Sequence, residues 1–519
     1  MWTPLRHRSF RWLWGSGGVY FLGNAMHTMA VSWLMVEITG SPLLSALVQT
    51  AAFLPMFLLS LPAGVLADIA DRRQLILGAL GVYAATALLL VVIALTGHAG
   101  PATLLALTFV MGCCTALQSP AWMSSVMDTI DRDELPKAIT IVSMAFNGAR
   151  AVGPALAGLI FALAGSSVVF GLAVRTALTM LVAVRSHPPA PHPTSKLPAE
   201  RLWGGMLSAL RYARHSPAVF AQLVRTIAFT GAGSALWALL PVVAQRQLGL
   251  GATGYGVLMG CLGSGAVATG FVVGQLRSRF GLDALVAACC TTFAGTMVVA
   301  ALSTRRPLVY AALVAGGAAW MAATSTMNAA TQTSAPMWVR ARAAAMHTLA
   351  ALGSFAIGSA LWGALSGVFG LVATLCAAAG CMAAGVALAL PFPLRMGARD
   401  EMAQAGAWGE IDIADEPAPQ AGPVAVEIAY RIPFDATAFL DAVEQLREPR
   451  RRDGATFWRV YRDLGDPTRY VERFIVSSWA DYLRQRERTL VADQGLEARV
   501  HAFQAEGVPV QMQHYLAER

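Results

Sequence analysis

The sequence predicts an all-α membrane protein of twelve transmembrane helices in two six-helix repeats, followed by a small α+β domain of ferredoxin-like fold. Three observations lead to this prediction. Hydrophobic residues make up 56% of the 519 residues and charged residues only 13%, whereas about 25% charged residues is usual in globular chains. Long apolar runs fill residues 1–394. The remaining residues are polar and net acidic, so the two parts are expected in different solvents.

Each apolar run is long enough to cross a hydrocarbon core of about 30 Å, which takes about 20 helical residues. We expect spans at residues 11–37, 42–67, 74–96, 101–127, 137–164, 166–184, 218–245, 253–276, 282–303, 307–332, 341–367 and 368–391. The first run follows several arginines but has no small-residue cleavage site, which indicates a retained helix rather than a signal peptide.

Basic residues between the predicted spans gather on one side of the membrane. Arg72, Arg73 and Lys137 lie on that side, whereas the opposite loops hold little more than Arg246 and Arg305. Because short loops rich in Lys and Arg stay in the cytoplasm, both termini are expected inside the cell.

A proline-rich stretch at residues 187–198 divides the spans into two halves. The predicted parts are a first half at 1–184, a linker at 185–217, a second half at 218–394, a connector at 395–422 and a soluble domain at 423–519. Three glycines of the fifth span recur at the same five-residue spacing in the eleventh span, as Gly353, Gly358 and Gly363. Two parallel repeats of six spans are typical of one large class of secondary transporters.

The loop between the second and third spans is the first candidate functional motif. Its predicted gating residues are Gly64, Asp68, Asp71, Arg72 and Arg73. Asp68 stands where the span leaves the membrane, so its carboxylate can accept hydrogen bonds from a helix N-terminus or pair with an arginine and latch the two halves together. The alternative is a solvated loop that only obeys the orientation rule.

The fifth span carries the second motif, Gly148, Gly153, Pro154 and Gly158. The proline removes a backbone hydrogen bond and is expected to kink the helix, while the glycines let a neighbouring helix approach closely. Ordinary packing of small residues is the alternative.

Polar residues inside a membrane are costly and indicate function. Arg150 lies about 20 Å along its helix from Lys137, near mid-membrane, and is the leading candidate to contact an anionic or carbonyl-rich substrate. Asn147 lies about one turn away on the same face. Arg175 and Arg225 are expected to snorkel to the headgroups.

Further side chains could supply stacking faces and hydrogen bonds to an aromatic substrate. These cavity candidates are Asn24, His27, Gln118, Trp237, Trp320 and Asn328. For each of them, plain helix packing is the alternative.

Several functions are not expected from this sequence. It has no GxxxxGK[ST] loop for ATP, and the seven cysteines have no metal-ligand spacing, so neither a cofactor, a metal nor a nucleic-acid partner is expected. No Asp or Glu lies near the middle of a predicted span. A proton gradient would then act through His27, Glu37 or a competition between substrate and proton.

The polar tail predicts a βαββαβ order, which is ferredoxin-like. Its strands are expected at 424–432, 456–463, 469–477 and 509–515, and its helices at 436–448 and 479–505. Residues 423–519 are expected to bind a protein partner or to self-associate, and the arginines at 450–452 to form a solvated turn. An enzyme would have to use His501, His514, Trp458 and Trp479, and no enzymatic activity is expected.

Residues 1–394 resemble a major facilitator superfamily transporter. The loop from Gly64 to Arg73 is similar to the superfamily signature GxLaDrxGRR, with Ile69 and Asp71 as departures. The fifth span resembles the antiporter-associated signature GxxxaGPxxGG, with Val152 and Ala157 as departures. The sequence around these motifs and in the tail resembles the enterobactin-exporter-like, transmembrane secretion effector branch, and this resemblance covers nearly the whole chain.

This resemblance implies that spans one, four, seven and ten line a cavity. It also implies a bacterial inner-membrane secondary transporter that exports a small organic molecule, drug-like or siderophore-like, by alternating access and is driven by protons. Two alternatives stay open. One is an uptake transporter, and the other is a membrane sensor that does not transport and carries a cytoplasmic interaction domain.

Overall fold

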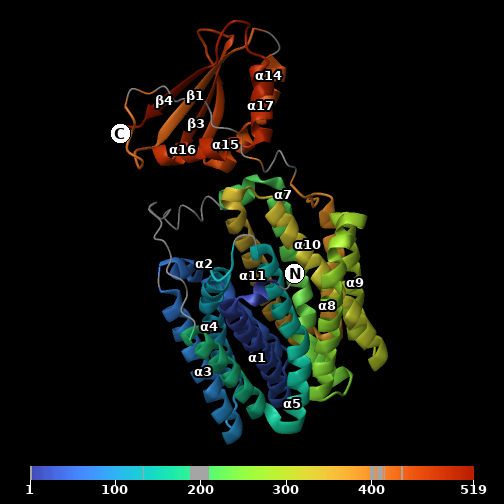
Figure 1. The fold of residues 1–519 in the computed structure, drawn as a ribbon. Coiled ribbons are helices and arrows are strands. Elements are labelled where there is room, and N and C mark those ends of the chain that lie inside the picture. Colours follow the sequence, from blue (N-terminus) through green and yellow to red (C-terminus); the bar gives the residue numbers. More distant parts are fainter. Residues whose placement is uncertain are drawn as a thin grey trace. The chain divides into compact units, whose positions relative to one another are not determined.

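The computed structural model describes residues 3–69, 71–131, 134–186, 210–397, 403, 405, 413, 415–433 and 436–518 (Figure 1). Most of the predicted linker and much of the predicted connector lie outside these residues. The chain forms two compact units. The first consists of Met1–Lys196, Arg225–Thr326 and Thr348–Pro391, and the second of Leu197–Val224, Met327–His347 and Phe392–Arg519.

Long helices make up the apolar part of the chain. In the first half they are α1 (Arg8–Thr39), α2 (Pro42–Ile69), α3 (Arg72–Thr96), α4 (Pro101–Met127) and α5 (Leu135–Ser186), preceded by the short η1 (Thr3–Arg6). In the second half they are α7 (Pro217–Val242), α8 (Ala252–Phe280), α9 (Leu282–Leu302), α10 (Arg306–Thr333), α11 (Met337–Phe369) and α12 (Leu371–Ala384). The helix α7 continues as the π-helical turn η3 (Val243–Gln247), and α12 continues as the short 3-10 helix η4 (Gly385–Ala389). These bounds follow the predicted apolar runs closely.

The described residues contain 10 helices that are long and apolar enough to cross a membrane. One of them, α5, has 52 residues, or about 78 Å at 1.5 Å per residue, far more than a hydrocarbon core of about 30 Å. It is broken at Gly165, whose φ of 81° is a conformation that glycine adopts easily. The chain is a multi-pass membrane protein, and the count of twelve spans stays a prediction because α1 is not among the 10 helices.

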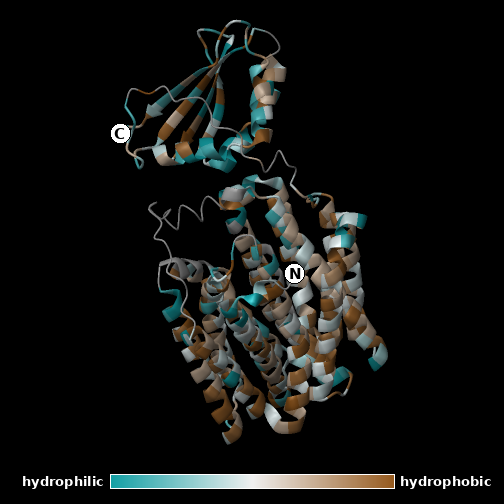
Figure 2. Ribbon diagram, in the orientation of Figure 1, coloured by the Kyte–Doolittle hydropathy of each residue, from teal (hydrophilic) through white to brown (hydrophobic). Residues whose placement is uncertain are grey.

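The surface of the bundle is apolar. Leu163, Phe271 and Val368 are each more than 70% exposed, and the bundle helices in Figure 2 range from white to brown with little teal, whereas the tail has more teal mixed with brown. Large exposed apolar surfaces of this kind are rare on soluble monomers and mark contact with a partner or a membrane. A lipid environment accounts for them here.

The tail contains a four-stranded antiparallel sheet in the order β2-β3-β1-β4. Its strands are β1 (Val424–Arg431), β2 (Phe457–Arg462), β3 (Arg469–Val476) and β4 (Gln511–Leu516), and its helices are α14 (Ala436–Glu444), α15 (Arg447–Asp453), α16 (Trp479–Arg488) and α17 (Val491–His501). Side chains alternate between buried and partly exposed along β1, as expected for a sheet with one face covered. The buried set packs against Phe439, Trp479 and Val500 from the helices.

The prediction of two helices in the tail was wrong, because each predicted helix is divided into two shorter ones. The longer one breaks at Thr489, whose ψ of 131° is not helical. The backbone amide of Leu490 then donates to Asp493 Oδ2 at 2.9 Å, and this contact starts α17. Such capping contacts depend on individual side chains, which a periodicity pattern does not register.

Candidate functional site

Arg150 on α5 connects the two halves of the first compact unit. Its guanidinium carbon lies 5.6 Å from the ring centroid of Trp237 on α7 and 6.0 Å from that of Phe146, one turn earlier on α5. Both distances are within the range of a cation–π interaction. The Arg150 side chain is exposed, and no carboxylate among the described residues pairs with it. The residue therefore presents an unneutralised cation beside aromatic faces.

An aromatic cluster of the second half surrounds Trp320 on α10. Its ring centroid lies 5.7 Å from that of Trp237, 5.3 Å from that of Phe229 and 5.4 Å from that of Phe293. Gly233 makes room for the indole, because a Cβ there would lie 2.6 Å from it. Trp237 Nε1 is buried and has no hydrogen-bond partner among the described residues. Since buried donors are normally paired, this one suits a ligand oxygen.

The other predicted cavity residues are placed as follows. Asn24 is half-buried and accepts a hydrogen bond from Tyr83 at 3.2 Å. His27 is 1% exposed, and its ring lies 5.7 Å from that of Phe170, in the packing of the first half. Gln118 is buried on α4. Asn328 belongs to the second compact unit, where it accepts from Gln332 at 3.2 Å, and the side chain of Asn147 lies outside the described residues.

The glycines of the fifth-span motif have three different surroundings. A Cβ on Gly158 would lie 2.7 Å from Ala252 O and 2.8 Å from Gly256 Cα, both on α8. A Cβ on Gly153 would lie 2.9 Å from Ala25 Cβ on α1. A Cβ on Gly148 would meet nothing within 4 Å. Gly158 therefore permits close contact between the two halves, and Gly153 permits close contact inside the first half. Within the described part of α5, the backbone leaves the helical region at Gly165 and not at Pro154.

A second seam between the halves joins α2 to α11. Thr50 Oγ1 donates to Ala356 O at 2.9 Å. A Cβ on Gly353 would lie 2.7 Å from the Phe57 ring, and one on Gly363 would lie 2.4 Å from Ala46 Cβ. Small residues on facing helices allow this close approach.

Both seams lie toward the end of the bundle where α1 ends and α2 begins, which we call the Gly40 end. The opposite end, where α2 ends and α3 begins, is called the Asp71 end. At the Gly40 end Trp33 also stacks on Tyr255 with 5.9 Å between ring centroids, and Arg246 Nη2 donates to Gly40 O at 2.6 Å. The two halves are thus closely joined at the Gly40 end.

The predicted gating motif makes its described contacts inside the first half. Asp71 caps α3 by accepting from the backbone amide of Arg73 at 2.8 Å. Arg72 pairs with Asp128 at the end of α4 at 3.0 Å, and Arg73 donates to Arg185 O at the end of α5 at 2.7 Å. The surroundings of Gly64 and the side chain of Asp68 lie outside the described residues. The latch between the halves therefore stays a prediction.

The expectation that Arg225 snorkels to the headgroups was wrong. The residue is 3% exposed, and its guanidinium pairs with Asp283 at the start of α9. A buried arginine with a nearby carboxylate has less reason to extend to the membrane surface, because the ion pair offsets the loss of water.

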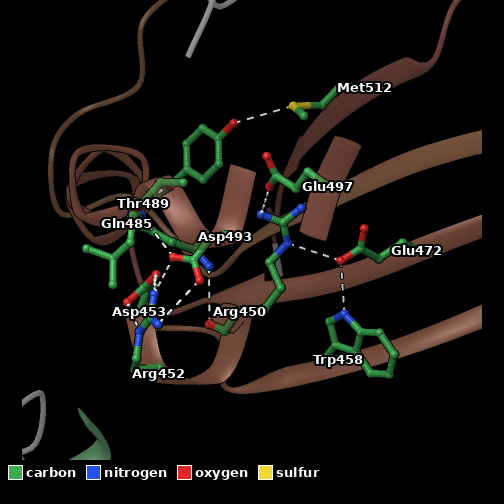
Figure 3. A network of polar contacts seen from close by, with 12 residues as sticks. Arg450, Arg452, Asp453, Trp458, Glu472, Gln485, Thr489, Asp493, Glu497 and Met512 are labelled. Atoms are coloured by element: carbon green, nitrogen blue, oxygen red, sulfur yellow. Dashed lines mark hydrogen bonds and ion pairs between the residues drawn. The ribbon is translucent and has the colours of Figure 1, made fainter. Parts of the chain in front are cut away.

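The tail holds a buried ion network around Arg450, drawn in Figure 3. The Arg450 guanidinium contacts Glu472 at 3.1 Å and Glu497 at 2.7 Å, and Glu472 also accepts from Trp458 Nε1 at 2.9 Å and from the Tyr430 hydroxyl at 3.0 Å. Burial alone would lower the pKa of Arg450, but the two carboxylates outweigh it and raise the pKa.

A second ion cluster lies beside this network. Arg452 bridges Asp453 at 2.8 Å and Asp493 at 2.6 Å. The prediction of a solvated arginine turn was wrong for Arg450 and Arg452, because facing carboxylates from distant parts of the chain draw both guanidinium groups inward.

The four residues that an enzymatic activity of the tail would have to use pack in two separate parts of the domain. Trp458 and His501 lie around Tyr430 and Glu472. The second place holds Trp479 and His514, with His514 Nε2 hydrogen-bonded to the Tyr482 hydroxyl at 2.6 Å. Burial lowers the pKa of His514. Across the described residues, no group of three or more His, Cys, Asp or Glu could hold a metal ion.

Comparison with characterised proteins supplies the family. The model of the transmembrane secretion effector family matches residues 1–519. The chain is 23% identical over 191 residues to the staphyloferrin A transporter of Staphylococcus aureus, a stretch that covers 37% of this chain and 47% of that protein. It is 24% identical over 152 residues to macrolide efflux protein A of Streptococcus pyogenes, which covers 29% and 38% of the two chains. These matches span less than half of each relative.

Solved structures agree on the fold of the membrane part. A bacterial homologue of the human lysosomal transporter Spinster, in an inward-facing and occupied conformation, aligns with a TM-score of 0.58 at 14% identity and covers 75% of this chain and 95% of its own. The nucleoside transporter NupG aligns with a TM-score of 0.60 at 11% identity and covers 75% and 100%. The chain belongs to the transmembrane secretion effector family of major facilitator superfamily transporters.

Proposed function

We propose that this protein is a secondary transporter of the bacterial inner membrane that exports small organic molecules by alternating access, with both termini in the cytoplasm. The observation that carries the proposal is the unneutralised Arg150 facing Trp237 across the two halves. Intramembrane arginines of this kind mark substrate pathways. The names of the relatives, a staphyloferrin A transporter and a macrolide efflux protein, support a siderophore-like or drug-like substrate.

The chemistry around Arg150 suits a ligand with a carboxylate or carbonyl group on an aromatic or apolar body. The guanidinium would bind the oxygen, the unpaired Trp237 Nε1 would donate to a second oxygen, and the indole faces of Trp237 and Trp320 would stack on the body. A few convergent polar groups in an apolar lining are the usual composition of such sites.

Alternating access would require the seams at the Gly40 end to open while the Asp71 end closes. In the described conformation the contacts between α5 and α8 and between α2 and α11 hold the Gly40 end shut. Twelve spans in two six-helix repeats would let the halves rock about a central site. The latch at the Asp71 end would be made by Asp68.

A proton gradient would supply the energy. His27 and Glu37 are the candidate carriers, together with a direct competition between proton and substrate. Of the two side chains, His27 is buried and Glu37 is exposed near the Gly40 end of α1. An uncoupler distinguishes driven export from facilitated diffusion without identifying the carrier.

The tail would be a ferredoxin-like interaction module of the cytoplasm. Its sheet order β2-β3-β1-β4 supports that fold, and its polar residues support a scaffold role because they are occupied in ion pairs within the domain. Self-association through residues 423–519 or binding of a protein partner would be its function.

Export is tested by the accumulation of fluorescent drugs and ferric siderophores in efflux-deficient cells that express the wild type, Arg150→Gln, Arg150→Lys or the control Arg305→Gln. We expect lower accumulation with the wild type, lost on uncoupling. Loss of a charge-assisted contact of about 1.5–3 kcal/mol should weaken apparent substrate affinity about 10- to 100-fold in Arg150→Gln.

The control Arg305→Gln, in an exposed loop, should behave as the wild type. Arg150→Lys should retain part of the activity, because it keeps the charge but not the planar fork. Higher accumulation with the wild type would mean uptake. Export that Arg150→Gln leaves intact would refute the assigned site.

A further inference from the structure

A groove of about 1020 Å³ runs between α1 and the second part of α5, away from the residues assigned to the transport site. It begins at the Asp71 end with Arg8 and Arg11 of α1, and it reaches inward to Arg175 and Gly171 of α5. The volume is at the upper end of the range for small-molecule pockets. Its lining combines three cations with an otherwise largely apolar wall.

Arg175 lies at the middle of a span-length helix. It is about 15 Å from Gly165, where α5 breaks, and about 16 Å from the helix end at Ser186. An arginine at this depth is costly unless it faces water or an anion. Its side chain is exposed and lines the groove. The guanidinium group can therefore extend along the groove toward the Asp71 end, as expected for a snorkelling arginine, and two further arginines line the groove there.

No carboxylate in the described part of the chain pairs with Arg8, Arg11 or Arg175. This distinguishes them from Arg72 and Arg225, which both have acidic partners. Three guanidinium groups that line one groove and have no carboxylate partner among the described residues are suited to bind an anion. Basic pockets between membrane helices bind the headgroups of anionic lipids.

The groove walls fit acyl chains as well as a headgroup. Val19, Leu178 and Val182 are 41%, 46% and 59% exposed, and they flank the arginines along the two helices. Trp12 lies near the mouth, where tryptophans are enriched at the membrane interface. A ligand matching both features is an amphiphilic anion.

We propose that this groove binds an anionic phospholipid of the leaflet at the Asp71 end. The headgroup lies beside Arg8 and Arg11, the Arg175 side chain reaches along the groove toward its phosphate, and the acyl chains extend inward along Val19 and Val174. The site is independent of the proposed export function, since it needs only the lipid environment.

The test is native mass spectrometry of the full-length protein purified in a neutral detergent and mixed with phosphatidylglycerol and phosphatidylcholine of identical chains. We expect the wild type to retain phosphatidylglycerol in preference. Arg175→Gln should lower that retention about tenfold, through loss of one charge-assisted contact, and Arg175→Lys should restore most of it.

A steric variant keeps the proposal testable if Arg175→Gln fails to fold. Gly171→Leu should fill the groove and displace the lipid, because a Cβ at Gly171 meets nothing within 4 Å and the backbone need not move. Gly78→Leu on α3, equally open, and Arg277→Gln on α8 are the matched controls and should retain the lipid.

Three results would overturn the proposal. The first is equal retention of both lipids by the wild type. The second is retention of phosphatidylglycerol by Gly171→Leu as strong as by Gly78→Leu. The third is displacement of phosphatidylglycerol by an equal concentration of free glycerol 1-phosphate, which would mean a site for a soluble anion rather than a lipid.

Discussion

Replacement of Gly158 by alanine should open the Gly40 end of the bundle. The new Cβ would lie 2.7 Å from Ala252 O and 2.8 Å from Gly256 Cα, whereas ordinary contacts begin at 3.4 Å. Both neighbours are backbone atoms of α8, so no side chain can turn away, and the helices must part by about 0.7 Å. Overpacking of this kind costs about 1–3 kcal/mol, which shifts a two-state equilibrium about 5- to 150-fold.

The assay is double electron–electron resonance between spin labels at Ser41→Cys and Thr253→Cys, on a chain whose seven native cysteines are replaced. These positions flank the two halves at the Gly40 end. Gly158→Ala should move the distance distribution toward longer separations. Gly148→Ala should leave it unchanged, because its Cβ meets nothing within 4 Å.

The control separates the seam from helix propensity, since both variants introduce the same residue into the same helix. If the two variants gave the same distribution, or if Gly158→Ala stayed closed, the close approach of α5 and α8 would not be what holds the halves together. The reasoning from Cβ distances would then be refuted.

Three further predictions concern the ion pairs and the tail. Asp283→Asn leaves the buried Arg225 without its carboxylate and should lower the free energy of unfolding by about 3 kcal/mol. The melting temperature should fall, and adding Arg225→Met to the same chain should restore it. An unchanged melting temperature would mean that the ion pair contributes little to stability. Glu472→Gln weakens the acceptor that holds Arg450 and should speed the hydrogen exchange of backbone amides in β1 and β3. If these amides exchanged as slowly as in the wild type, the ion network would contribute negligibly to the stability of the tail. Burial lowers the pKa of His514 below 6.5, so the unfolded state binds the proton more readily and the tail should lose stability as pH falls below about 6.5. Opening free energies from hydrogen exchange at pH 7.5 and 5.5 check this, and a His514→Gln variant with undiminished pH dependence would contradict it.

The helices of the membrane part could be predicted from the sequence because their signal is local. An apolar run of about 20 residues is sufficient to indicate a span, and the predicted boundary between residues 164 and 166 coincides with the break at Gly165. Arg150 could be singled out in the same way, since an arginine within an apolar run is unusual wherever the helix packs.

The surroundings of individual side chains could not be predicted, because they depend on contacts between distant segments. Gly148 and Gly158 carry the same motif, yet only one of them meets another helix in the structure. Arg450 and Arg452 stand in a run of three arginines, which is typical of a solvated turn, but acidic residues from β3 and α17 bury them. The groove at Arg175 could not be predicted from the sequence for the same reason. The signal that could have indicated it is that no acidic residue lies near Arg175 in the sequence to pair with it.

Within the second compact unit, the tail is attached to the chain at two places. One attachment is covalent, through the connector. The other is a pair of contacts to the helical run 210–215 just before α7, where Arg211 Nη1 donates to Gly454 O at 2.8 Å and His215 Nδ1 lies 2.7 Å from Glu448 Oε2. Truncation after α12 would therefore remove more than an appendage, because it would uncover a basic surface at the entrance to a membrane helix.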